Sequence, residues 1–268
     1  MRLIGHVAVN VFKESVRDKV LYNLVAFAVL LIAVSYLLGQ LTAGQDIKII
    51  KDLGLAAIAS FGRLIAVFIG IGLVWKEVER RSIYSLLSKP IRRHEFLLGK
   101  YAGLALTLFV NVAVMTAAFY TVLAYLNTQF PEAVRASWPA PATDPGMLRA
   151  IALIFLELLL ITAVALFFST FSSPFLSAAL TCGLWVIGHF NSDLQSFETV
   201  VDSPAAAYLA RALYYVLPNF AAFDIKTQVV YALPVPGFYM VVTSAYAFVY
   251  IALLLTTAAV IFSKRDFK

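Results

Sequence analysis

WKEVERRSIYSLLSKPIRRHEFLLGK, residues Trp75 to Lys100, is a densely charged stretch between two long apolar runs. Its basic residues Lys76, Arg80, Arg81, Lys89, Arg92, Arg93 and Lys100 outnumber its acidic residues Glu77, Glu79 and Glu95. A short loop rich in lysine and arginine between membrane spans marks the cytoplasmic side. The stretch therefore predicts a cytoplasmic loop at 75–100 and sets the orientation of the chain.

Inside this loop, the apolar residues follow a helical spacing. Ile83, Leu86 and Leu87 fall at i, i+3 and i+4 and so share one face of a short helix. Pro90 ends that helix, because proline lacks a backbone N–H and disfavours helix at the residue before it. The loop thus holds a small apolar face just outside the bilayer, which suits either lipid headgroups or a soluble partner.

The composition places the whole chain in a membrane. The 268 residues are 62% hydrophobic and 13% charged, with a mean hydropathy of +0.86, whereas soluble domains carry about 25% charged residues. We expect an all-α integral membrane protein, since helices satisfy their own backbone hydrogen bonds in lipid. The net charge of +6 comes from basic residues beside apolar runs, so it indicates sidedness and not nucleic-acid binding.

Residues 1–19 have the pattern of an amphipathic helix. Ile4, Ala8 and Phe12 follow one i+4 ridge, while Lys13, Glu14 and Arg17 point away from it. A helix of this kind lies along the membrane surface. The alternative is a simple cytosolic extension of the first span.

Six membrane spans follow from the apolar runs. They are expected at about 21–41, 53–74, 101–126, 147–171, 175–190 and 238–262. The loop at 127–146 is rich in proline and poor in lysine and arginine, as expected outside. Ser172 to Pro174 leave room only for a tight turn, so the fourth and fifth spans are predicted to be antiparallel neighbours. Both termini are then cytoplasmic, in a multi-pass protein of the cytoplasmic (inner) membrane.

The outer loop at 191–237 contains an apolar segment of its own. Pro204 to Leu217 is too apolar for solvent, yet at 1.5 Å per residue it reaches only about 20 Å. We expect a re-entrant or interfacial helix here, begun by Ser203 and Pro204 and ended by Pro218. The alternative, a seventh span, would place the basic C-terminus outside.

The motifs of nucleotide binding and catalysis are missing from the sequence. Gly99-Lys100 lacks the earlier glycine and the following Ser or Thr of a P-loop. His6, His94 and His189 fall on different segments and do not predict a metal site. Cys182, the single cysteine, is expected to be a small core residue. We therefore predict no catalytic residue, metal or cofactor on this chain.

Two charges interrupt the apolar spans. Arg63 and Glu157 each lie about ten residues from the outer end of a predicted span, so both fall near the bilayer midplane. A charge there costs about 2.5–3.5 kcal/mol on insertion scales and tends to find a partner. We expect an ion pair between them, either as a structural brace or as part of the lining of a substrate path.

Residues 76–100 resemble a known family. Together with Lys13-Glu14 and Arg17-Asp18-Lys19 before the first span and Lys264-Arg265-Asp266-Phe267 after the last, they are similar to the permease subunit of ABC transporters of the type-two exporter family. The resemblance covers essentially the whole chain. One departure is Arg80-Arg81, where many relatives carry a glycine.

The resemblance implies a permease driven by a separate protein. On this view two ABC ATPase subunits bind ATP and Mg, and the permease pairs with a second copy of itself or with a related permease. The helix between spans two and three becomes the coupling helix, and the N-terminal helix, with Phe12, Lys13, Glu14 and Arg17, is a second ATPase contact. The coupling residues implied are Glu77, Glu79, Arg80, Arg81, Ile83, Tyr84, Leu86, Leu87, Lys89 and Pro90.

Two other functions remain open on the sequence alone. One is a membrane anchor or mechanical assembly component that recruits an ATPase without conducting a substrate. The other is an intramembrane enzyme acting on lipid, which the missing acid, base and metal sets disfavour. The apolar spans favour an amphipathic or lipid-like substrate if the chain is an exporter.

Overall fold

The computed structural model describes residues 2–40, 46–79, 93–191, 211 and 214–264, and the elements in these ranges are helical. The described helices are α1 (Arg2–Val16), α2 (Lys19–Gln40), α3 (Asp46–Glu79), α5 (Arg93–Gln129), α6 (Glu132–Arg135), α7 (Gly146–Ser169), α8 (Pro174–His189), η2 (Ala221–Phe223), α11 (Lys226–Val230) and α12 (Gly237–Lys264).

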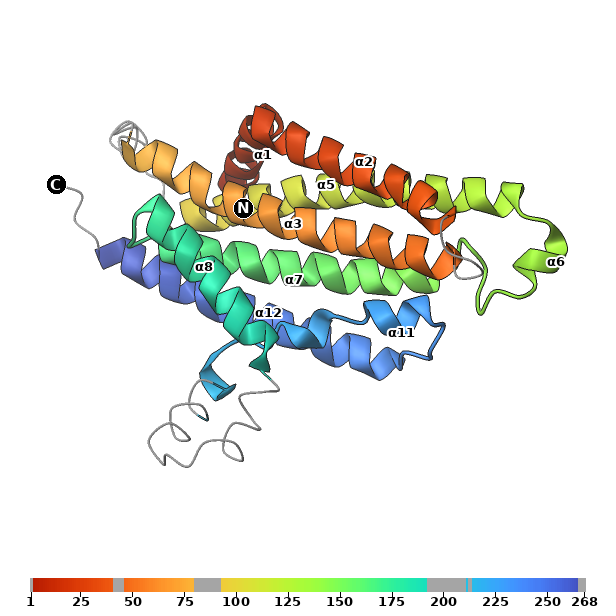
Figure 1. The fold of residues 1–268 in the computed structure, drawn as a ribbon. Coiled ribbons are helices and arrows are strands. Elements are labelled where there is room, and N and C mark those ends of the chain that lie inside the picture. The colour runs from red at the N-terminus through yellow and green to blue at the C-terminus, as the bar shows by residue number, and fades with distance from the viewer. Residues whose placement is uncertain (1, 41–45, 80–92, 192–210, 212–213, 265–268) are drawn as a thin grey trace.

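Five of these helices are long and apolar enough to cross a membrane, namely α2, α3, α5, α7 and α12. They run roughly along a common axis in Figure 1. The prediction of an all-helical membrane protein is confirmed, whereas the predicted six spans are met by five long helices and the shorter α8.

Two helices are longer than the predicted spans. α3 begins at Asp46 and continues to Glu79, and α5 begins at Arg93, against predicted starts at residues 53 and 101. Hydropathy locates the part of a helix that lies in lipid, but backbone hydrogen bonding continues until a breaker stops it. Both helices therefore extend toward residues 80–92, the part of the charged stretch that lies outside the described residues.

α7 is the central helix of the bundle. It contacts α3, α5, α8, α11 and α12, and most of its residues are buried, from Met147 to Ser169. Figure 1 shows it between α3 and α12. A helix that is apolar on all sides and surrounded by others suits this position.

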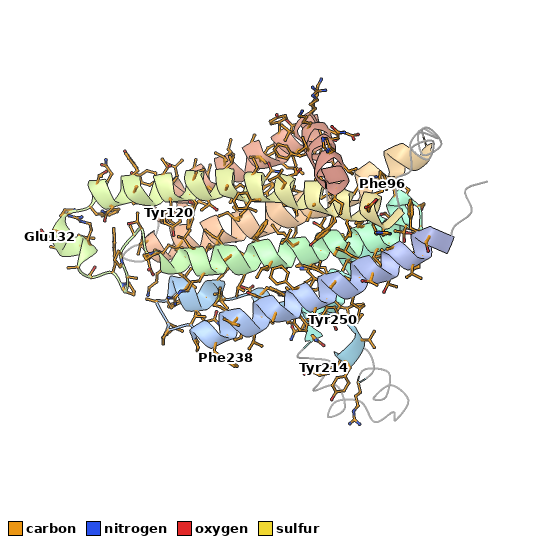
Figure 2. All side chains as sticks on the ribbon, turned by 180° about the vertical axis from the view of Figure 1, so that it is seen from behind. Phe96, Tyr120, Glu132, Tyr214, Phe238 and Tyr250 are labelled. Atoms are coloured by element: carbon orange, nitrogen blue, oxygen red, sulfur yellow. The ribbon has the colours of Figure 1, made fainter. Side chains whose placement is uncertain are left out.

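The outer faces of the bundle are apolar. Phe27 on α2 is 61% exposed, and Phe238 and Val241 on α12 are 80% and 66% exposed. Figure 2 shows such side chains along the length of the bundle. Large apolar surfaces of this kind are typical of contact with lipid or with another membrane chain.

α1 crosses the bundle and packs against α5 (Figure 1). Val11 and Ser15 are buried in this contact, while Lys13, Glu14 and Arg17 are exposed and Phe12 is half-buried. The backbones come close at Gly103, where an added Cβ would lie 2.6 Å from the carbonyl oxygen of Ala8 and 2.7 Å from the side chain of Val11. α1 and the first turns of α5 therefore form one packed unit.

We expect Gly103→Ala to weaken this packing. Because the clash is with backbone, it cannot be relieved by rotating a side chain, and we expect a loss of about 1–3 kcal/mol. Gly5→Ala on α1 is the matched control: a Cβ there meets nothing within 4 Å, and alanine favours a helix by about 0.5–1 kcal/mol. Thermal unfolding of the two purified variants in one detergent measures the difference; equal midpoints would mean that α1 does not pack as described.

The end of the bundle near α6, called the α6 end, is held by polar contacts. Lys51 is buried on α3 and its Nζ donates a hydrogen bond to the carbonyl oxygen of Pro141 over 2.9 Å. The hydroxyl of Tyr120 donates to the carbonyl oxygen of Asp144 over 3.1 Å. These contacts fix the connection between α5 and α7 onto α3 and α5. In Figure 2, Glu132 marks the α6 end and Phe96 the opposite end, called the Glu79 end because α3 finishes there.

α8 does not reach from one end of the bundle to the other. Its 16 residues span about 24 Å, less than the roughly 30 Å of a bilayer core. Figure 1 shows it leaving the Glu79 end at a tilt and finishing near the middle of the bundle. The predicted fifth span at 175–190 corresponds to this shorter helix, which ends near the middle of the bundle, and residues 214–236 run along the rest of the way to the start of α12.

Candidate functional site

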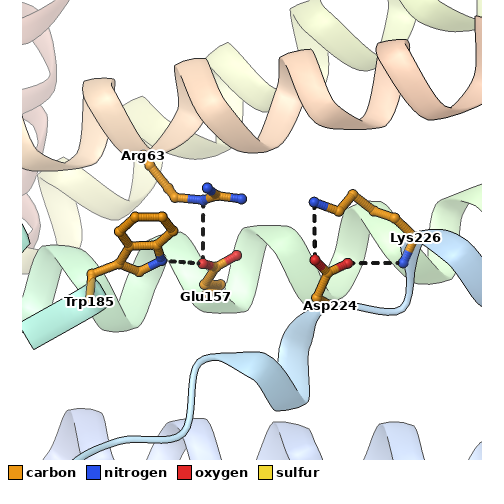
Figure 3. A network of polar contacts seen from close by, with 5 residues as sticks. All are labelled: Arg63, Glu157, Trp185, Asp224 and Lys226. Atoms are coloured by element: carbon orange, nitrogen blue, oxygen red, sulfur yellow. Dashed lines mark hydrogen bonds and ion pairs between the residues drawn. The ribbon is translucent and has the colours of Figure 1, made fainter. Parts of the chain in front are cut away.

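A polar cluster lies at the middle of the bundle and is built from three helices. Arg63 comes from α3, Glu157 from α7 and Trp185 from α8 (Figure 3). Glu157 lies about 17 Å from each end of α7. The structure therefore brings together the two charges that the sequence singles out, and it adds an indole that the sequence does not predict.

The Glu157 carboxylate is the centre of the cluster. Its Oε1 accepts a hydrogen bond from Trp185 Nε1 over 2.9 Å and lies 3.4 Å from Arg63 Nε. The Arg63 guanidinium also stacks on the Trp185 ring, 4.7 Å from its centroid, a contact worth about 0.5–2 kcal/mol. Each of the three side chains contacts the other two.

Arg63 has hydrogen-bonding capacity left over. The contact of 3.4 Å is longer than the 2.7–2.9 Å of a charge-assisted hydrogen bond, and among the described residues Arg63 Nε is buried without a hydrogen-bond partner. Guanidinium presents five N–H donors. The ion pair with Glu157 balances the charge of Arg63 but leaves donors for another acceptor.

The close approach of α3 to α7 explains why this pair can form. An added Cβ at Gly62 would lie 2.6 Å from the Leu158 side chain, and one at Gly70 would lie 2.7 Å from the Cβ of Ala165. Small residues let two membrane helices approach closely. Arg63 and Glu157 are the neighbours of Gly62 and Leu158, so the same approach sets the distance between the charges.

A second ion pair lies beside the first along α7. Lys226 Nζ is 3.1 Å from Asp224 Oδ2, and Figure 3 shows this pair next to Arg63 and Glu157. The charges of Asp224 and Lys226 act on Glu157 electrostatically. Sequence reasoning missed both residues because it assigned 191–237 to an outer loop, where charges are ordinary.

The segment that carries Asp224 is inserted between helices. Phe220 and Phe223 are buried, and Phe220 N donates to the carbonyl oxygen of Gly188 over 2.9 Å. Asn219 N donates to the Tyr246 hydroxyl of α12 over 2.7 Å. The predicted re-entrant helix at Pro204 to Leu217 falls mostly outside the described residues, and the described inserted segment begins after it.

The end of α8 fits this inserted segment because Gly188 has no side chain. A Cβ there would meet the carbonyl oxygen of Pro218 and would lie 2.7 Å from the Phe220 ring. We expect Gly188→Ala to displace the segment and to cost about 1–3 kcal/mol. Gly183→Ala on the same helix, where a Cβ meets nothing within 4 Å, is expected to be neutral or slightly stabilising.

Thermal unfolding in detergent measures both variants, with limited proteolysis at the α8–η2 connection as a local readout. Faster cleavage of Gly188→Ala than of Gly183→Ala is the expected result. Identical cleavage and identical midpoints would show that the inserted segment is not held at the end of α8.

A cavity of about 710 Å³ opens beside the polar cluster, between α3 and α8 with α7 at its base. We call it the α3–α8 cavity. It is lined by Ser60, Arg63, Leu64, Val67, Phe68 and Ile71 from α3, by Ile161 from α7, and by Pro174, Phe175, Ala178, Cys182 and Trp185 from α8.

The α3–α8 cavity is polar at one end and apolar along the rest of its length. Arg63 and Trp185 lie near the middle of the bundle, whereas Pro174 and Phe175 lie near the Glu79 end. Cys182 is exposed here, so the expectation of a core cysteine is wrong. Its small side chain faces a cavity that α8 leaves open by tilting away from α3.

The coupling residues expected from the sequence fall at the edge of the described structure. Glu77 and Glu79 are in the last turn of α3, and residues 80–92, which hold the others, lie outside the described residues. The described residues also contain no group of three or more His, Cys, Asp and Glu side chains placed to hold a metal ion.

Comparison with known proteins identifies a family that this chain matches. Residues 6–267 match the model of a family described as ABC-2 family transporter protein. A search of curated proteins finds no match. The family model spans nearly the whole chain and so includes the polar cluster, the α3–α8 cavity and the charged stretch.

Proposed function

Because this chain belongs to the ABC-2 transporter family, we propose that it is the permease subunit of an ATP-driven ABC exporter. ATP and Mg are bound by separate ATPase subunits, and this chain moves an amphipathic or lipid-like substrate across the cytoplasmic membrane. The observation that carries the proposal is the family match over residues 6–267, together with the five long apolar helices of a multi-pass membrane protein.

The arrangement of α3 supports coupling between residues 80–92, where the ATPase is proposed to bind, and the α3–α8 cavity. α3 is continuous from Asp46 to Glu79, so Arg63 lies about 24 Å along the same helix from Glu79. α3 also supplies half of the residues that line the α3–α8 cavity. A force applied at residues 80–92 would tilt α3 and change the width of the cavity.

α5 and α1 provide a second connection. α5 begins at Arg93, directly after the charged stretch, and α1 packs on its first turns at Gly103. In the proposed complex, the coupling residues and the exposed face of α1 with Lys13, Glu14 and Arg17 contact the ATPase from the cytoplasmic side. Both termini lie on that side.

The proposed assembly contains two permease chains, either two copies of this chain or this chain with a related one, and two ATPase subunits. The apolar faces of α2 and α12 supply surface for a second permease. The alternative function is a membrane anchor or assembly component that recruits an ATPase and conducts nothing.

Reconstitution separates these functions. Each ABC ATPase encoded beside this chain's gene is co-expressed with it, and the purified complex is placed in liposomes with a fluorescent fatty acid. We expect ATP-dependent movement of the probe, absent when the ATPase cannot hydrolyse ATP. A complex that hydrolyses ATP but moves no member of a panel of amphiphiles would favour the anchor function, and a chain that binds no ATPase would contradict both.

A further inference from the structure

We infer that the α3–α8 cavity binds an amphiphile whose acidic head accepts hydrogen bonds from Arg63 and whose apolar chain lies between α3 and α8 toward the Glu79 end. This deepens the proposed function, because it gives the substrate class and the place where it is held. That the bound amphiphile is the transported substrate rests on the proposed function, whereas the binding of an amphiphile in this cavity does not.

The polar end of the cavity suits an occupant with an acceptor. The single N–H of Arg63 Nε is buried and faces Glu157, 3.4 Å away. The Arg63 side chain as a whole is 19% exposed and lines the cavity, so its terminal N–H groups are the donors that an occupant can reach. A carboxylate or phosphate placed against Arg63 would accept hydrogen bonds from these groups, whereas a lipid tail or an apolar helix of a second chain offers no acceptor.

The remaining length of the cavity suits an apolar chain. From Ser60 to Ile71 on α3 and from Pro174 to Trp185 on α8, the two walls each extend about 16 Å. Their side chains are mainly aliphatic and aromatic, and the volume of about 710 Å³ lies within the 300–1,000 Å³ of small-molecule sites. A sugar or an inorganic ion would leave these walls without complementary contacts.

The cavity is reached from the side of the bundle. Leu64 and Phe68 on α3 are 45% and 57% exposed, and Phe175 on α8 is 86% exposed. These residues line the cavity and also belong to the apolar outer surface. An amphiphile dissolved in the bilayer can therefore enter laterally, with its chain among apolar residues throughout.

The acidic head of the amphiphile would contact a cluster whose positive and negative charges cancel, and not an isolated cation. Arg63 and Lys226 are balanced by Glu157 and Asp224, and Trp185 already donates to Glu157. An acidic head is thus held by the unused donors of Arg63 and not by a net positive charge. For this reason we expect binding to depend weakly on salt and strongly on Arg63.

Trp185 supplies a direct probe of binding. The chain has three tryptophans, so Trp75→Phe with Trp138→Phe leaves Trp185 as the reporter in the full chain, in whatever complex it purifies. Dibromostearic acid quenches indole fluorescence on contact, and a brominated alkane of the same length lacks the head. We expect saturable quenching by the acid and only weak, non-saturating quenching by the alkane.

Two variants of α8 test the location. Ala178 lines the cavity and its neighbour Ala179 is exposed outside it. Ala178→Phe fills the cavity and is expected to weaken the binding of dibromostearic acid by at least about tenfold. Ala179→Phe adds the same side chain to the same helix and should leave the affinity unchanged.

A further variant tests whether Arg63 binds the acidic head of the amphiphile. Arg63→Gln combined with Glu157→Gln keeps the cluster neutral and keeps an acceptor for Trp185, but it removes the guanidinium that stacks on the indole. Quenching is therefore measured relative to the variant's own fluorescence without probe. We expect the double variant to bring the affinity for the acid down to that for the alkane. A brominated lysophospholipid in place of the acid distinguishes a phosphate head from a carboxylate.

Several outcomes would overturn the inference. Equal quenching in the Ala178→Phe and Ala179→Phe variants would mean that Trp185 meets bilayer lipid only. Protection of Trp185 from every probe would mean that a second chain covers the cavity. The experiment needs no ATPase, so its failure leaves the proposed coupling intact, and a failure of ATPase association would not affect the quenching.

Discussion

Glu157→Gln is expected to destabilise the folded chain by about 3–5 kcal/mol, because removing one member of a buried ion pair leaves the other charge uncompensated. Glutamine keeps the shape of the side chain and an oxygen that can accept from Trp185. The loss therefore reports the charge itself. The Glu157 side chain is 6% exposed and that of Arg63 19% exposed, so water compensates little of it.

A double-mutant cycle with Arg63→Gln assigns this loss to the pair. Arg63→Gln leaves the Glu157 carboxylate buried without its counter-charge and is expected to cost a similar amount. The double variant buries two neutral amides, so we expect its loss to fall short of the sum of the single losses by about 0.5–3 kcal/mol. Denaturant or thermal unfolding of the purified variants in one detergent provides the values.

Arg149→Gln is the control for this cycle. Arg149 is an exposed arginine near the start of the same helix α7, with one long contact of 3.4 Å to the carbonyl oxygen of Val235. Its replacement should change stability by no more than about 0.5 kcal/mol. Independent, additive losses for Arg63 and Glu157 would show that they do not act as a pair.

Leu86→Asp combined with Leu87→Asp is expected to abolish association with the ATPase while leaving the membrane bundle folded. The sequence places Ile83, Leu86 and Leu87 on one face of a short helix. A few buried apolar residues supply most of the energy of an interface, and two carboxylates there would have to be desolvated on binding.

Ser85→Asp combined with Ser88→Asp provides a matched control with the same change in charge. Both serines fall on the opposite face of the predicted helix. Co-purification of the co-expressed ATPase measures the effect. We expect at least about a tenfold loss of bound ATPase for the leucine variant and little change for the serine variant, with both eluting as folded protein; normal ATPase binding by the leucine variant would refute the coupling assignment.

The sequence predicts the charges at the centre of this protein well, for a clear physical reason. Arg63 and Glu157 each interrupt a long apolar run, and a charge in lipid is costly enough to imply a partner at the same depth. Counting residues from the outer ends of the two parallel spans gives that depth, and the structure places the two side chains together.

Other parts of the site follow from packing and could not be read from the pattern. Trp185 and Cys182 look like ordinary members of an apolar run, and only the tilt of α8 turns one toward Glu157 and exposes the other. Hydropathy also does not show that α8 stops halfway. The sequence therefore assigns Asp224 and Lys226 to a loop, although both lie beside α7 (Figure 3).

Lys51 is a similar case at the α6 end. A lysine next to a predicted span is expected at the surface, yet Lys51 is buried, and the carbonyl oxygen of Pro141, 90 residues away in sequence, accepts a hydrogen bond from its Nζ. Partners that are distant in sequence decide such burial. The charged stretch is the opposite case, since its role is inferred from the sequence and the family alone.

ATP-driven movement of a fluorescent fatty acid in liposomes that contain this chain and its ATPase is the most direct test of the account. We compare Ala178→Phe, which fills the α3–α8 cavity, with Ala179→Phe, which does not. The account predicts that both variants hydrolyse ATP but that only Ala179→Phe moves the probe. Equal movement by the two variants would show that the substrate does not pass through this cavity, and no ATP-dependent movement by the unmodified complex would contradict its role as an exporter of amphiphiles.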